Sequence, residues 1–426
     1  MNIVMMTNTY KPIVGGLEKS VELFSKKYRK LGHQVLIVAP EFKDQTEEKG
    51  VFRVLAIQNF NGTDFSVKLP ISTKLNNRLL DFKPDIVHTH HPFLIGDTAL
   101  RVAKKFNIPL VFTHHTLYER YTHYVPADSP LIKKFVVQLT AGYANLCDSV
   151  IAPSNAIKDL LKERKVKTPI ESIPTGIKID SFSSGKGNNF REKNKISKDD
   201  FVVGFVSRVA KEKNIYFLAK VVAQFLKNEK KSHFLIIGDG PDKEEVRSFF
   251  KKQGLEDRVT STGTIKGKEL INAYAAMDIF AFASFTETQG LVVQEAMAAS
   301  LPVVALDAPG VGEVIEDKVN GYLLDSENIS KFCSALEKIQ KMDKKKLKKM
   351  KESAYQTAAG FSLDKQVKKA VKLYKKLISK EPAKKGKENN LWQEAKRVIK
   401  AEISLVKNLT QATQEALKKD FLEKKE

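Results

Sequence analysis

The chain has 426 residues, of which 42% are hydrophobic and 29% are charged, and its formal net charge is +22. This length exceeds what one ordinary hydrophobic core accommodates, so two domains of similar size are expected. Two cysteines, Cys147 and Cys333, exclude a disulfide framework, and the lack of any run of about eighteen apolar residues excludes an evident membrane span.

The excess of positive charge calls for an anionic partner, which could be nucleic acid, an acidic bilayer or a phosphorylated small molecule. The sequence shows neither zinc-finger spacing nor an RNP-type aromatic run, so we expect no specific nucleic-acid partner. Residues 341–351, "KMDKKKLKKMK", hold seven lysines against one aspartate. This block is typical of a solvated helix face, and the alternative is a contact with anionic lipid.

Short apolar runs alternate with helical periodicity through the first half of the chain. Residues 17–31 repeat apolar side chains at spacings of four and three, and Gly32 ends that helix. The alternation predicts a parallel sheet covered by helices on both faces. The strand-like runs are residues 2–6, 34–40, 85–90 and 109–115.

The second half repeats this organisation after a polar, glycine-bearing stretch at residues 184–200, where we place the domain boundary. Strand-like runs follow at residues 201–208, 233–241, 258–263, 279–284 and 302–307. We therefore expect an α/β protein of two doubly wound Rossmann-like domains facing a cleft, residues 1–185 and 200–360. In such sheets ligands bind outside the carboxyl ends of the strands.

The C-terminal part departs from this pattern. Residues 361–379 are expected to form a crossover helix that packs back on the N-terminal domain, and residues 380–426 a lysine-rich helical extension. The extension could pack on its own domain or a partner helix, or it could lie on a membrane, and its modest amphipathicity favours packing. The apolar seam expected in it comprises Ala395, Val398, Glu402, Leu405, Leu409, Ala412 and Ala416.

Two pairs of residues are suited to a diphosphate. Gly15 and Gly16 lie between the first strand and the first helix, where backbone amides can face an anion, although a plain tight turn would use them as readily. Arg208 follows a strand and Lys213 comes five residues later, so both cations could reach one diphosphate. Solvent-facing charges are the alternative for the second pair.

The stretch "TETQGLVVQEA", residues 286–296, carries two carboxylates around a glycine. Glu287 precedes Gly290 and Leu291 at the mouth of a predicted helix, and Glu295 lies inside that helix. Carboxylates placed there can accept hydrogen bonds from paired hydroxyls, which suits a sugar or a ribose better than a metal. The alternative is a helix-dipole charge at Glu287 and an ordinary surface residue at Glu295.

We expect no metal in the site. No aspartate stands two positions from another, so the D-x-D pair of many metal-dependent sugar transferases is absent. Charge on a departing diphosphate must then be met by Arg208, Lys213 and backbone amides.

Five histidines cluster at predicted strand ends in the first half of the chain. Their spacings do not match a zinc set, so metal binding is disfavoured. For His115 we favour a hydrogen bond to a sugar hydroxyl. The five are His88, His90, His91, His114 and His115.

Taken together, the motifs resemble those of the large retaining glycosyltransferase family 4, of GT-B fold, over residues 1–378. The resemblance rests on "TNTYKPIVGGLEKSV", "PDIVHTHHP", "VSRVAKEKN", "IIGDGP" and the E-x7-E spacing of Glu287 and Glu295, all in family order. It implies transfer without a metal or other cofactor, with retention of configuration. The leaving phosphate would take the acceptor proton.

The resemblance also implies residue roles. The amides of Gly16, with Arg208 and Lys213, would hold the diphosphate of a nucleotide sugar, and Glu295 would hold the ribose hydroxyls. The transferred sugar would be bound by Glu287 and the amides of Gly290 and Leu291, with His115 near the reacting carbon.

Within the family, "THHTLYERYTHY" and "TETQGL" resemble the branch that glucosylates diacylglycerol, although His114 stands where tyrosine is usual. This implies UDP-glucose as donor, an anionic membrane surface as partner and a cytoplasmic, peripheral location at the inner face of the membrane. The acceptor-side residues would be His88, Arg120, Tyr121 and Tyr124. GDP-mannose with a phosphatidylinositol-type lipid, a soluble acceptor, and a non-catalytic nucleotide-sugar- or nucleic-acid-binding module remain alternatives.

Overall fold

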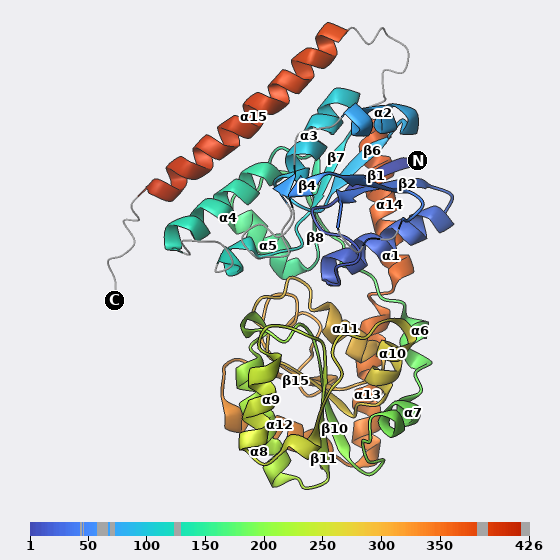
Figure 1. Ribbon diagram of the computed structural model, residues 1–426, viewed down its shortest axis with the longest axis vertical. Coiled ribbons are helices and arrows are strands. Elements are labelled where there is room, and N and C mark those ends of the chain that lie inside the picture. The colour runs from blue at the N-terminus through green and yellow to red at the C-terminus, as the bar shows by residue number, and fades with distance from the viewer. Residues whose placement is uncertain are drawn as a thin grey trace. The chain divides into compact units, whose positions relative to one another are not determined.

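The computed structural model describes residues 1–42, 45, 47–57, 67–68, 73–122, 129–380 and 391–418 (Figure 1). The chain forms two compact units. The first comprises residues 1–174 together with 366–426, and the second comprises residues 175–365. Tyr124, predicted to lie on the acceptor side, falls outside the described residues.

The first unit is built on a seven-stranded sheet whose neighbouring strands are all parallel. Its strands are β1 (Asn2–Met6), β2 (Gln34–Pro40), β3 (Val51–Val54), β6 (Ile86–Thr89), β7 (Leu110–Thr113), β8 (Ser149–Ala152) and β9 (Ile170–Ser172). They lie in the order β3-β2-β1-β6-β7-β8-β9, so the strand order reverses between β1 and β6. A separate antiparallel pair joins β4 (Ala56–Ile57) to β5 (Val67–Lys68).

Helices accompany the strands of the first unit as the alternating pattern predicted. They are α1 (Gly16–Lys30), α2 (Thr73–Phe82), α3 (Ile95–Phe106), the short 3-10 turn η2 (Tyr118–Arg120), α4 (Pro130–Ala144), α5 (Asn155–Glu163), α14 (Leu363–Lys380) and α15 (Leu391–Leu417). The hydroxyls of Ser129 and Ser154 cap α4 and α5 by accepting from amides of their first turns. By contrast, α1 begins after Gly15 with no side-chain cap.

The second unit contains a six-stranded parallel sheet in the order β12-β11-β10-β13-β14-β15. Its strands are β10 (Phe201–Val206), β11 (Ser232–Ile237), β12 (Val259–Ser261), β13 (Ile279–Phe282), β14 (Val303–Leu306) and β15 (Gly321–Leu324). Its helices are α6 (Ile179–Ser183), α7 (Gly187–Lys193), η4 (Lys211–Lys213), α8 (Ile215–Asn228), α9 (Lys243–Lys252), η5 (Glu256–Arg258), α10 (Gly267–Ala275), α11 (Leu291–Ala298), α12 (Ile329–Gln340) and α13 (Lys344–Ala359).

Both sheets carry near-continuous apolar runs because helices bury the central strands on both faces. Every residue of β11, β13 and β14 is buried, and β1 and β6 are buried except at Asn2, the first residue of β1. The predicted fold, two doubly wound Rossmann-like domains followed by a helical C-terminal region, is confirmed by this topology.

The domain boundary differs from the sequence prediction, because the chain enters the second unit at Thr175 and the stretch 184–200 lies wholly inside that unit. Phe182 packs edge-on against Tyr274 of α10. Arg191, in the polar stretch taken for a linker, is buried and donates to the carbonyl of Ala276 and to the carboxylate of Asp278. A polar composition therefore concealed a packed segment.

The chain returns to the first unit along α14. The amide of Leu363 donates to Ile177 within the second unit, whereas Tyr374, further along the helix, is buried in the first unit. There its hydroxyl lies 3.1 Å from the hydroxyl of Tyr28 and 2.6 Å from Nδ1 of His88. This helix therefore joins the two units covalently.

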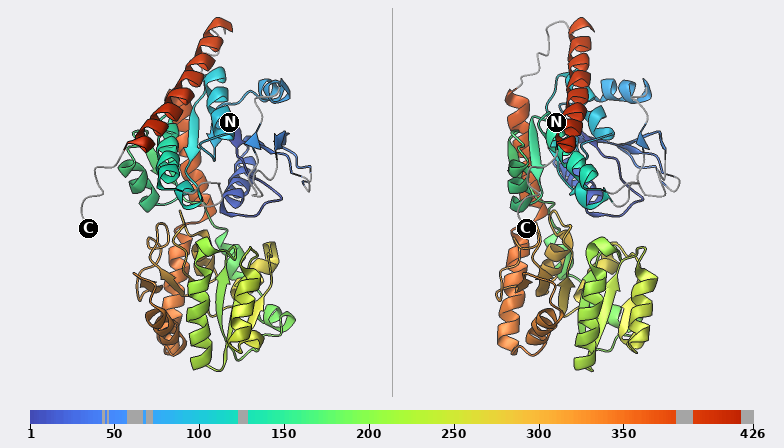
Figure 2. Two further views of the ribbon diagram at one scale, coloured as in Figure 1. Left: turned by 60° about the vertical axis from the view of Figure 1, so that its left-hand side comes forward. Right: turned by 90° about the vertical axis from the view of Figure 1, so that its left-hand side faces the viewer.

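The last described helix, α15, lies along α3 and α4 of the first unit (Figure 2). Ala412 and Ala416 of the predicted seam are buried against it, but Ala395 and Leu409 are exposed, and Ala401 and Asn408 take their place. No helix in the described part of the chain is long and apolar enough to cross a bilayer.

Candidate active site

In the second unit, the predicted donor-binding residues follow two strands that lie side by side. β10 and β13 are hydrogen-bonded neighbours, and the strand order reverses between them. Loops at such a reversal separate and leave room for a ligand at the carboxyl edge of the sheet. The loop after β10 carries Arg208 and Lys213, and the loop after β13 carries Glu287 and Gly290. The structure therefore brings these loops to one edge.

Lys213 and Glu287 meet across these two loops. The Lys213 ammonium donates to the Glu287 carboxylate over 2.7 Å, and both side chains are mostly buried. The hydroxyl of Thr286 donates to the carbonyl of Glu212 over 3.2 Å and fastens the same loops together. An ion pair screened from water is strongly sensitive to loss of one partner, because the other is then left uncompensated. The pair thus fixes both side chains.

Arg208 is the more exposed of the two predicted cations. Its guanidinium lies 4.0 Å from the carboxylate of Glu212, whose side chain is buried, while 46% of the Arg208 side chain is exposed. A guanidinium that is accessible to solvent can reach a phosphate and form a bidentate contact with it. The position is compatible with the predicted role.

The "IIGDGP" motif supports the Arg208 loop, a role that sequence reasoning did not assign. A Cβ added at Gly238 would lie 1.9 Å from the carbonyl oxygen of Ser207, and one at Gly240 would lie 2.2 Å from that of Val209. The Val209 amide also donates to the carbonyl of Asp239 over 3.0 Å. Only glycine allows backbones to approach so closely. The backbone of this motif therefore packs against the loop after β10 and stabilises it.

Gly290 forms the start of α11 in a left-handed conformation, with φ 67° and ψ 46°. A residue with a side chain would be strained in this backbone conformation, and its Cβ would lie 3.0 Å from Cγ2 of Val311. The following residue, Leu291, is the first of the helix, so its amide belongs to the unsatisfied N-terminal set. These amides and the helix dipole favour an electronegative ligand.

Glu295 lies in the second turn of α11 and is only 2% exposed. Its carboxylate accepts a hydrogen bond of 3.1 Å from the hydroxyl of Tyr274, a residue of α10. Burial and this neighbouring carboxylate raise the pKa of Tyr274 well above its usual value, so the phenol stays protonated as a donor. The alternative of an ordinary surface residue is therefore wrong for Glu295, and the Tyr274 contact was not foreseen.

Gln289 has a structural role that the motif alone did not reveal. Its amide group bonds to the backbone of Thr175 at both atoms, over 2.7 and 2.8 Å, and to the side chain of Gln294. It therefore anchors the loop before α11 to the point where the chain enters the second unit. Nothing in the spacing indicates this, because the two residues are 114 positions apart.

In the first unit, Gly15 and Gly16 lie at the N-terminus of α1, as predicted. Gly15 is extended, and a Cβ on it would meet the Glu18 carboxylate at 2.4 Å. At Gly16 no atom lies within 4 Å of an added Cβ. The backbone at Gly16 therefore has room for a side chain, whereas Gly15 lies directly against the carboxylate of Glu18.

His88 is part of a buried chain of hydrogen bonds. The hydroxyl of Tyr28 donates to the hydroxyl of Tyr374. The proton of the Tyr374 hydroxyl is then available for Nδ1 of His88, which lies 2.6 Å away. On the other side of the ring, Nε2 of His88 lies 2.7 Å from the hydroxyl of Thr113. Both ring nitrogens are thus engaged inside the unit. The predicted contact of His88 with an acceptor is not supported, because the side chain is buried and its hydrogen-bonding capacity is used.

His90 and His115 form a second pair. Nδ1 of His90 lies 2.9 Å from Nε2 of His115, and the rings stack at 5.2 Å between centroids. His91 is fixed separately, since its Nδ1 accepts from the amide of Asn8 over 3.1 Å. The sequence predicted that the histidines gather at strand ends, but it did not predict that His90 would hold His115.

Burial keeps this cluster neutral. Desolvation lowers the pKa of His88, His91, His114 and His115 to about 3, and it lowers the pKa of His90 well below its usual value. A neutral imidazole has one donor and one acceptor nitrogen. His115 is therefore suited to hydrogen bonding rather than to electrostatic stabilisation.

The remaining acceptor-side residues lie close in sequence to this cluster. Arg120 ends η2 with an exposed side chain, and Tyr121 follows it partly buried. His114, the residue that departs from the usual tyrosine, is fully buried, and neither of its ring nitrogens has a partner among the described residues. Its ring packs edge-on against Phe112 and Tyr118.

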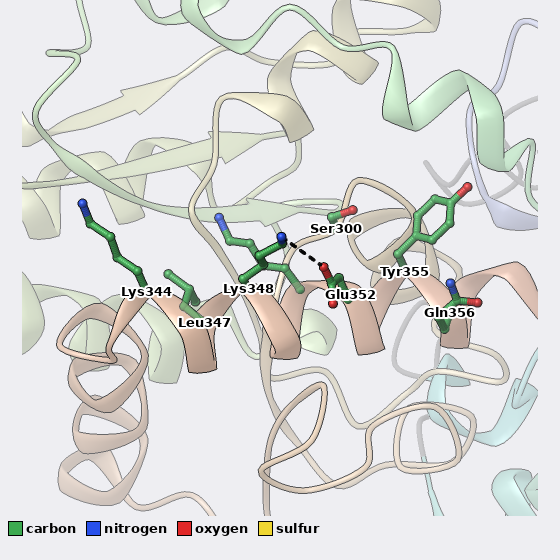
Figure 3. Close-up of a pocket in the computed structure, with 8 residues that line it drawn as sticks. Ser300, Lys344, Leu347, Lys348, Glu352, Tyr355 and Gln356 are labelled. Atoms are coloured by element: carbon green, nitrogen blue, oxygen red, sulfur yellow. Dashed lines mark ion pairs between the residues drawn. The ribbon is translucent and has the colours of Figure 1, made fainter.

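The lysine block lies elsewhere, on α13 of the second unit. A pocket of about 480 Å³ is lined by Ser300, Lys344, Leu347, Lys348, Lys351, Glu352, Tyr355 and Gln356 (Figure 3). Lys348 lies 3.9 Å from Glu352, and both side chains are exposed. Within the described ranges, no group of three or more histidine, cysteine or acidic side chains could hold a metal ion.

Comparison with known families agrees with the geometry. Residues 14–181 match the family described as "Glycosyltransferase Family 4", and residues 187–357 match the one described as "Glycosyl transferases group 1". The helix α15 lies outside both matches.

Several curated proteins are similar over most of the chain. The alpha-monoglucosyldiacylglycerol synthase of Streptococcus pneumoniae is 32% identical over 335 residues, covering 77% of this chain and 76% of its own. The protein of the same name from Acholeplasma laidlawii is 32% identical over 342 residues, covering 76% and 85%. A GDP-mannose-dependent alpha-mannosyltransferase of Corynebacterium glutamicum is 28% identical over 341 residues, covering 76% and 77%.

Solved structures share the fold at lower identity. An Anabaena protein in complex with UDP and glucose aligns with a TM-score of 0.70 at 20% identity, covering 88% of this chain and 99% of that one. Sucrose-phosphate synthase from Thermosynechococcus elongatus aligns with a TM-score of 0.72 at 18% identity, with the same coverage. With the family matches and the identity to the two synthases, these likenesses show that the chain is a glycosyltransferase of GT-B fold that belongs to glycosyltransferase family 4.

Proposed function

We propose that the protein transfers glucose from UDP-glucose to 1,2-diacylglycerol, with retention of anomeric configuration and without a metal or other cofactor. The observation that carries the proposal is the 32% identity to two proteins named alpha-monoglucosyldiacylglycerol synthase. This similarity extends over about three quarters of the chain, 77% in one case and 76% in the other.

The second unit supplies the groups that such a donor requires. Arg208 and Lys213 would neutralise the diphosphate, and Glu287 with the amides of Gly290 and Leu291 would bind the sugar hydroxyls. The 2.7 Å contact of Lys213 with Glu287 supports this assignment. It places a cation beside a carboxylate that can accept hydrogen bonds from hydroxyls, both at the carboxyl edge of the sheet. Glu295 would bind the ribose, where it would have to share its carboxylate with Tyr274.

For the first unit, the proposal keeps Gly15 and Gly16 as amide contacts for the diphosphate and His115 as a contact for the sugar. Arg120 and Tyr121 are kept on the acceptor side. In the transfer, the bond between the anomeric carbon and the leaving phosphate oxygen breaks, and a bond to the acceptor oxygen forms on the same face. The proton of the acceptor hydroxyl leaves with the UDP phosphate.

A lipid acceptor places the reaction at a membrane surface. We propose a peripheral location at the cytoplasmic face of an anionic membrane, supported by the net charge of +22 and the lysine block on α13. Each lysine or arginine near an anionic surface contributes about 1 kcal/mol of attraction.

The test is a transfer assay with UDP-glucose and diacylglycerol in mixed micelles, with the lipid product identified and the anomer assigned by NMR. Lys213→Ala is expected to lower kcat/KM by about 100-fold or more, since charge stabilisation of the leaving group is lost. Glu287→Gln is expected to lower it by a similar factor, since the sugar loses an anionic acceptor for its hydroxyls and Lys213 loses its ion-pair partner. The matched control is Lys211→Ala, which removes an exposed lysine from the same η4 turn and is expected to leave the rate unchanged.

Three results would count against the proposal. No glucolipid would form from UDP-glucose, the two site variants would work as well as the control, or activity would disappear on chelation and return with magnesium or manganese. The last result would remove the metal-independent mechanism while leaving the transfer itself.

A second donor is supported by one observation, the 28% identity to GDP-mannose-dependent alpha-mannosyltransferases. GDP-mannose, with phosphatidylinositol or a soluble acceptor, therefore belongs in the same assay. Preferential use of GDP-mannose would replace the glucose assignment.

A further inference from the structure

The helix α15 has two faces with opposite surroundings. On the inner face, Ala401, Asn408, Ala412 and Ala416 are buried against the unit that carries the helix. The amide of Asn408 donates to the carbonyl of Leu139 in α4 over 3.1 Å. This face accounts for the attachment of the helix to the first unit.

The outer face of α15 is apolar although the fold does not bury it. We define it by five residues that are 48 to 64% exposed, Trp392, Ile399, Ile403, Val406 and Leu417. At 100° per residue they fall within an arc of about 60°, opposite the buried face. A helix packed on one side normally carries polar residues on the other, so an apolar outer stripe marks a surface that binds something.

Lysines flank this outer face on one side. Lys396, Lys400 and Lys407 are exposed and lie along its edge, and the ammonium of Lys396 is 5.2 Å from the ring centroid of Trp392. A stripe of aliphatic and aromatic residues with basic residues beside it is the composition of helices that lie in a membrane interface.

The acidic residues of the described helix do not offset these lysines, because each is paired with another cation of the same unit. Glu394 lies 3.3 Å from Lys105, Glu402 binds Arg101 through both of its oxygens, and Glu415 pairs with Lys418. The outer face therefore presents net positive charge to whatever it meets.

We propose that the outer face of α15 docks the first unit on an anionic lipid bilayer, with its apolar stripe at the level of the headgroups and its lysines on acidic lipids. The proposal rests on the lipid acceptor of the proposed function. Charge complementarity selects a bilayer as the occupant. A second copy of the chain would bring the same lysine-flanked surface against itself, with no acidic residue to offset it.

The position of α15 connects this docking to the acceptor side. Helix α4 contacts both α15 and η2, and η2 leads through Arg120 to Tyr121. Helix α4 would therefore fix the position of a membrane bound by α15 relative to the segment that is proposed to receive the lipid. The helix lies beyond residue 357, where the family matches end, so it is an addition to the matched core.

The first experiment uses the only tryptophan of the chain, Trp392, as a reporter on this face. Full-length protein is mixed with vesicles of phosphatidylcholine alone or with about 30 mol% phosphatidylglycerol at low salt. Docking by α15 is expected to shift the emission to the blue and to allow quenching by brominated lipid only with the anionic vesicles. Co-sedimentation with those vesicles without any change in emission would overturn the proposal, because another surface would then be bound.

The second experiment changes the stripe itself. The variant Ile399→Gln/Ile403→Gln/Val406→Gln keeps helix-forming residues and is expected to lower the vesicle partition coefficient at least about tenfold. The matched control is Leu31→Gln/Leu55→Gln/Val319→Gln, which removes three other exposed apolar side chains and is expected to bind as the wild type does. Equal binding by the stripe variant, or an equal loss in the control, would contradict the proposal.

The charge contribution is measured separately. Lys396→Gln/Lys400→Gln/Lys407→Gln is expected to weaken binding by a factor of about five per lysine at low ionic strength and to flatten its salt dependence. The corresponding change at Lys345, Lys346 and Lys349 of the α13 block is expected to weaken binding less. An equal effect of both triples would mean that α15 has no special part in the attraction.

Transfer to diacylglycerol in detergent micelles separates this proposal from the proposed function. The stripe variant is expected to keep wild-type turnover in micelles, because transfer there does not require binding of the protein to a bilayer. If no glucolipid forms while vesicle binding depends on α15, the function fails and the docking stands. If sedimentation velocity shows a wild-type dimer that the stripe variant dissociates, with vesicle binding unchanged, the face pairs two copies and the docking fails.

Discussion

Lys213 and Glu287 lie 74 positions apart in sequence and 2.7 Å apart in the second unit. Both are mostly buried, so each depends on the other for compensation of its charge. A donor diphosphate would add negative charge beside Lys213, and a sugar would add hydroxyl donors beside Glu287. The pair therefore stabilises the two loops of the second unit, and under the proposed function its members would contact neighbouring parts of the donor, the diphosphate and the sugar.

Gly290 provides a test of how tightly the start of α11 is held. Gly290→Ala is expected to lower the free energy of unfolding by about 1–2 kcal/mol through its left-handed backbone, and by more where the new methyl group meets Val311. Chemical denaturation measures the stability, and the transfer assay measures the effect on the sugar-binding loop.

The matched control for that change is Gly254→Ala. Gly254 has the same φ of 67°, but no atom lies within 4 Å of its added Cβ. The difference between the two variants therefore reports the contacts around Gly290, of which that with Val311 is the shortest. Identical losses of stability would show that the loop accommodates the methyl group without cost.

Among the elements, α11 and α15 show two ways in which a helix is placed. Helix α11 has eight residues and is buried through its second turn, so its position is fixed by the sheet and by Gln289. Helix α15 has 27 residues and packs on α3 and α4 through one narrow row of small and polar residues, beside which Glu394 and Glu402 pair with cations of α3. Its attachment should therefore respond to single substitutions on that row.

Ala401→Glu is expected to detach α15 from the first unit, because it places a carboxylate where the native side chain is buried. Hydrogen exchange of the helix amides measures the detachment as a loss of protection. The control is Ala395→Glu, the same substitution at an exposed position of the same helix, which is expected to keep wild-type protection. Equal protection in both variants would mean that the inner face does not hold the helix.

For the molecule as a whole, the buried histidines predict sensitivity to acid. Desolvation lowers the pKa of His88, His91 and His114 from an ordinary value of 6.5 to about 3. Between these two pH values the unfolded chain therefore binds more protons than the folded unit does. The resulting stability is fully present above pH 6.5 and is lost as the pH falls toward 3. Each histidine contributes at most about 1.4 kcal/mol per pH unit in that window.

Urea denaturation between pH 7 and pH 4 measures this dependence. The informative variant is His114→Phe, since the ring is fully buried, neither nitrogen has a partner among the described residues and it already packs on Phe112. This variant is expected to unfold with a shallower pH dependence, by up to one proton. An unchanged slope would show that His114 is not the buried neutral group inferred here.

Much of the architecture could be predicted from sequence because parallel strands buried on both faces appear as apolar runs, and helices between them repeat with their own period. The same reasoning placed Arg208, Glu287 and Gly290 after strands, where ligands of such sheets bind. The same reasoning wrongly placed the domain boundary at residues 184–200. The residues that bind the buried Arg191, Ala276 and Asp278, lie far away in sequence.

The sequence by itself thus determined the class of fold, the positions of the chemical groups along the chain and the ends of the strands they follow. The tertiary structure alone decided that β10 lies beside β13, that Lys213 meets Glu287, that His88 is enclosed by Tyr374 and that α15 turns one apolar face outward. Periodicity records which side of an element is buried, whereas the identity of its neighbour depends on the order of strands and on contacts between distant residues.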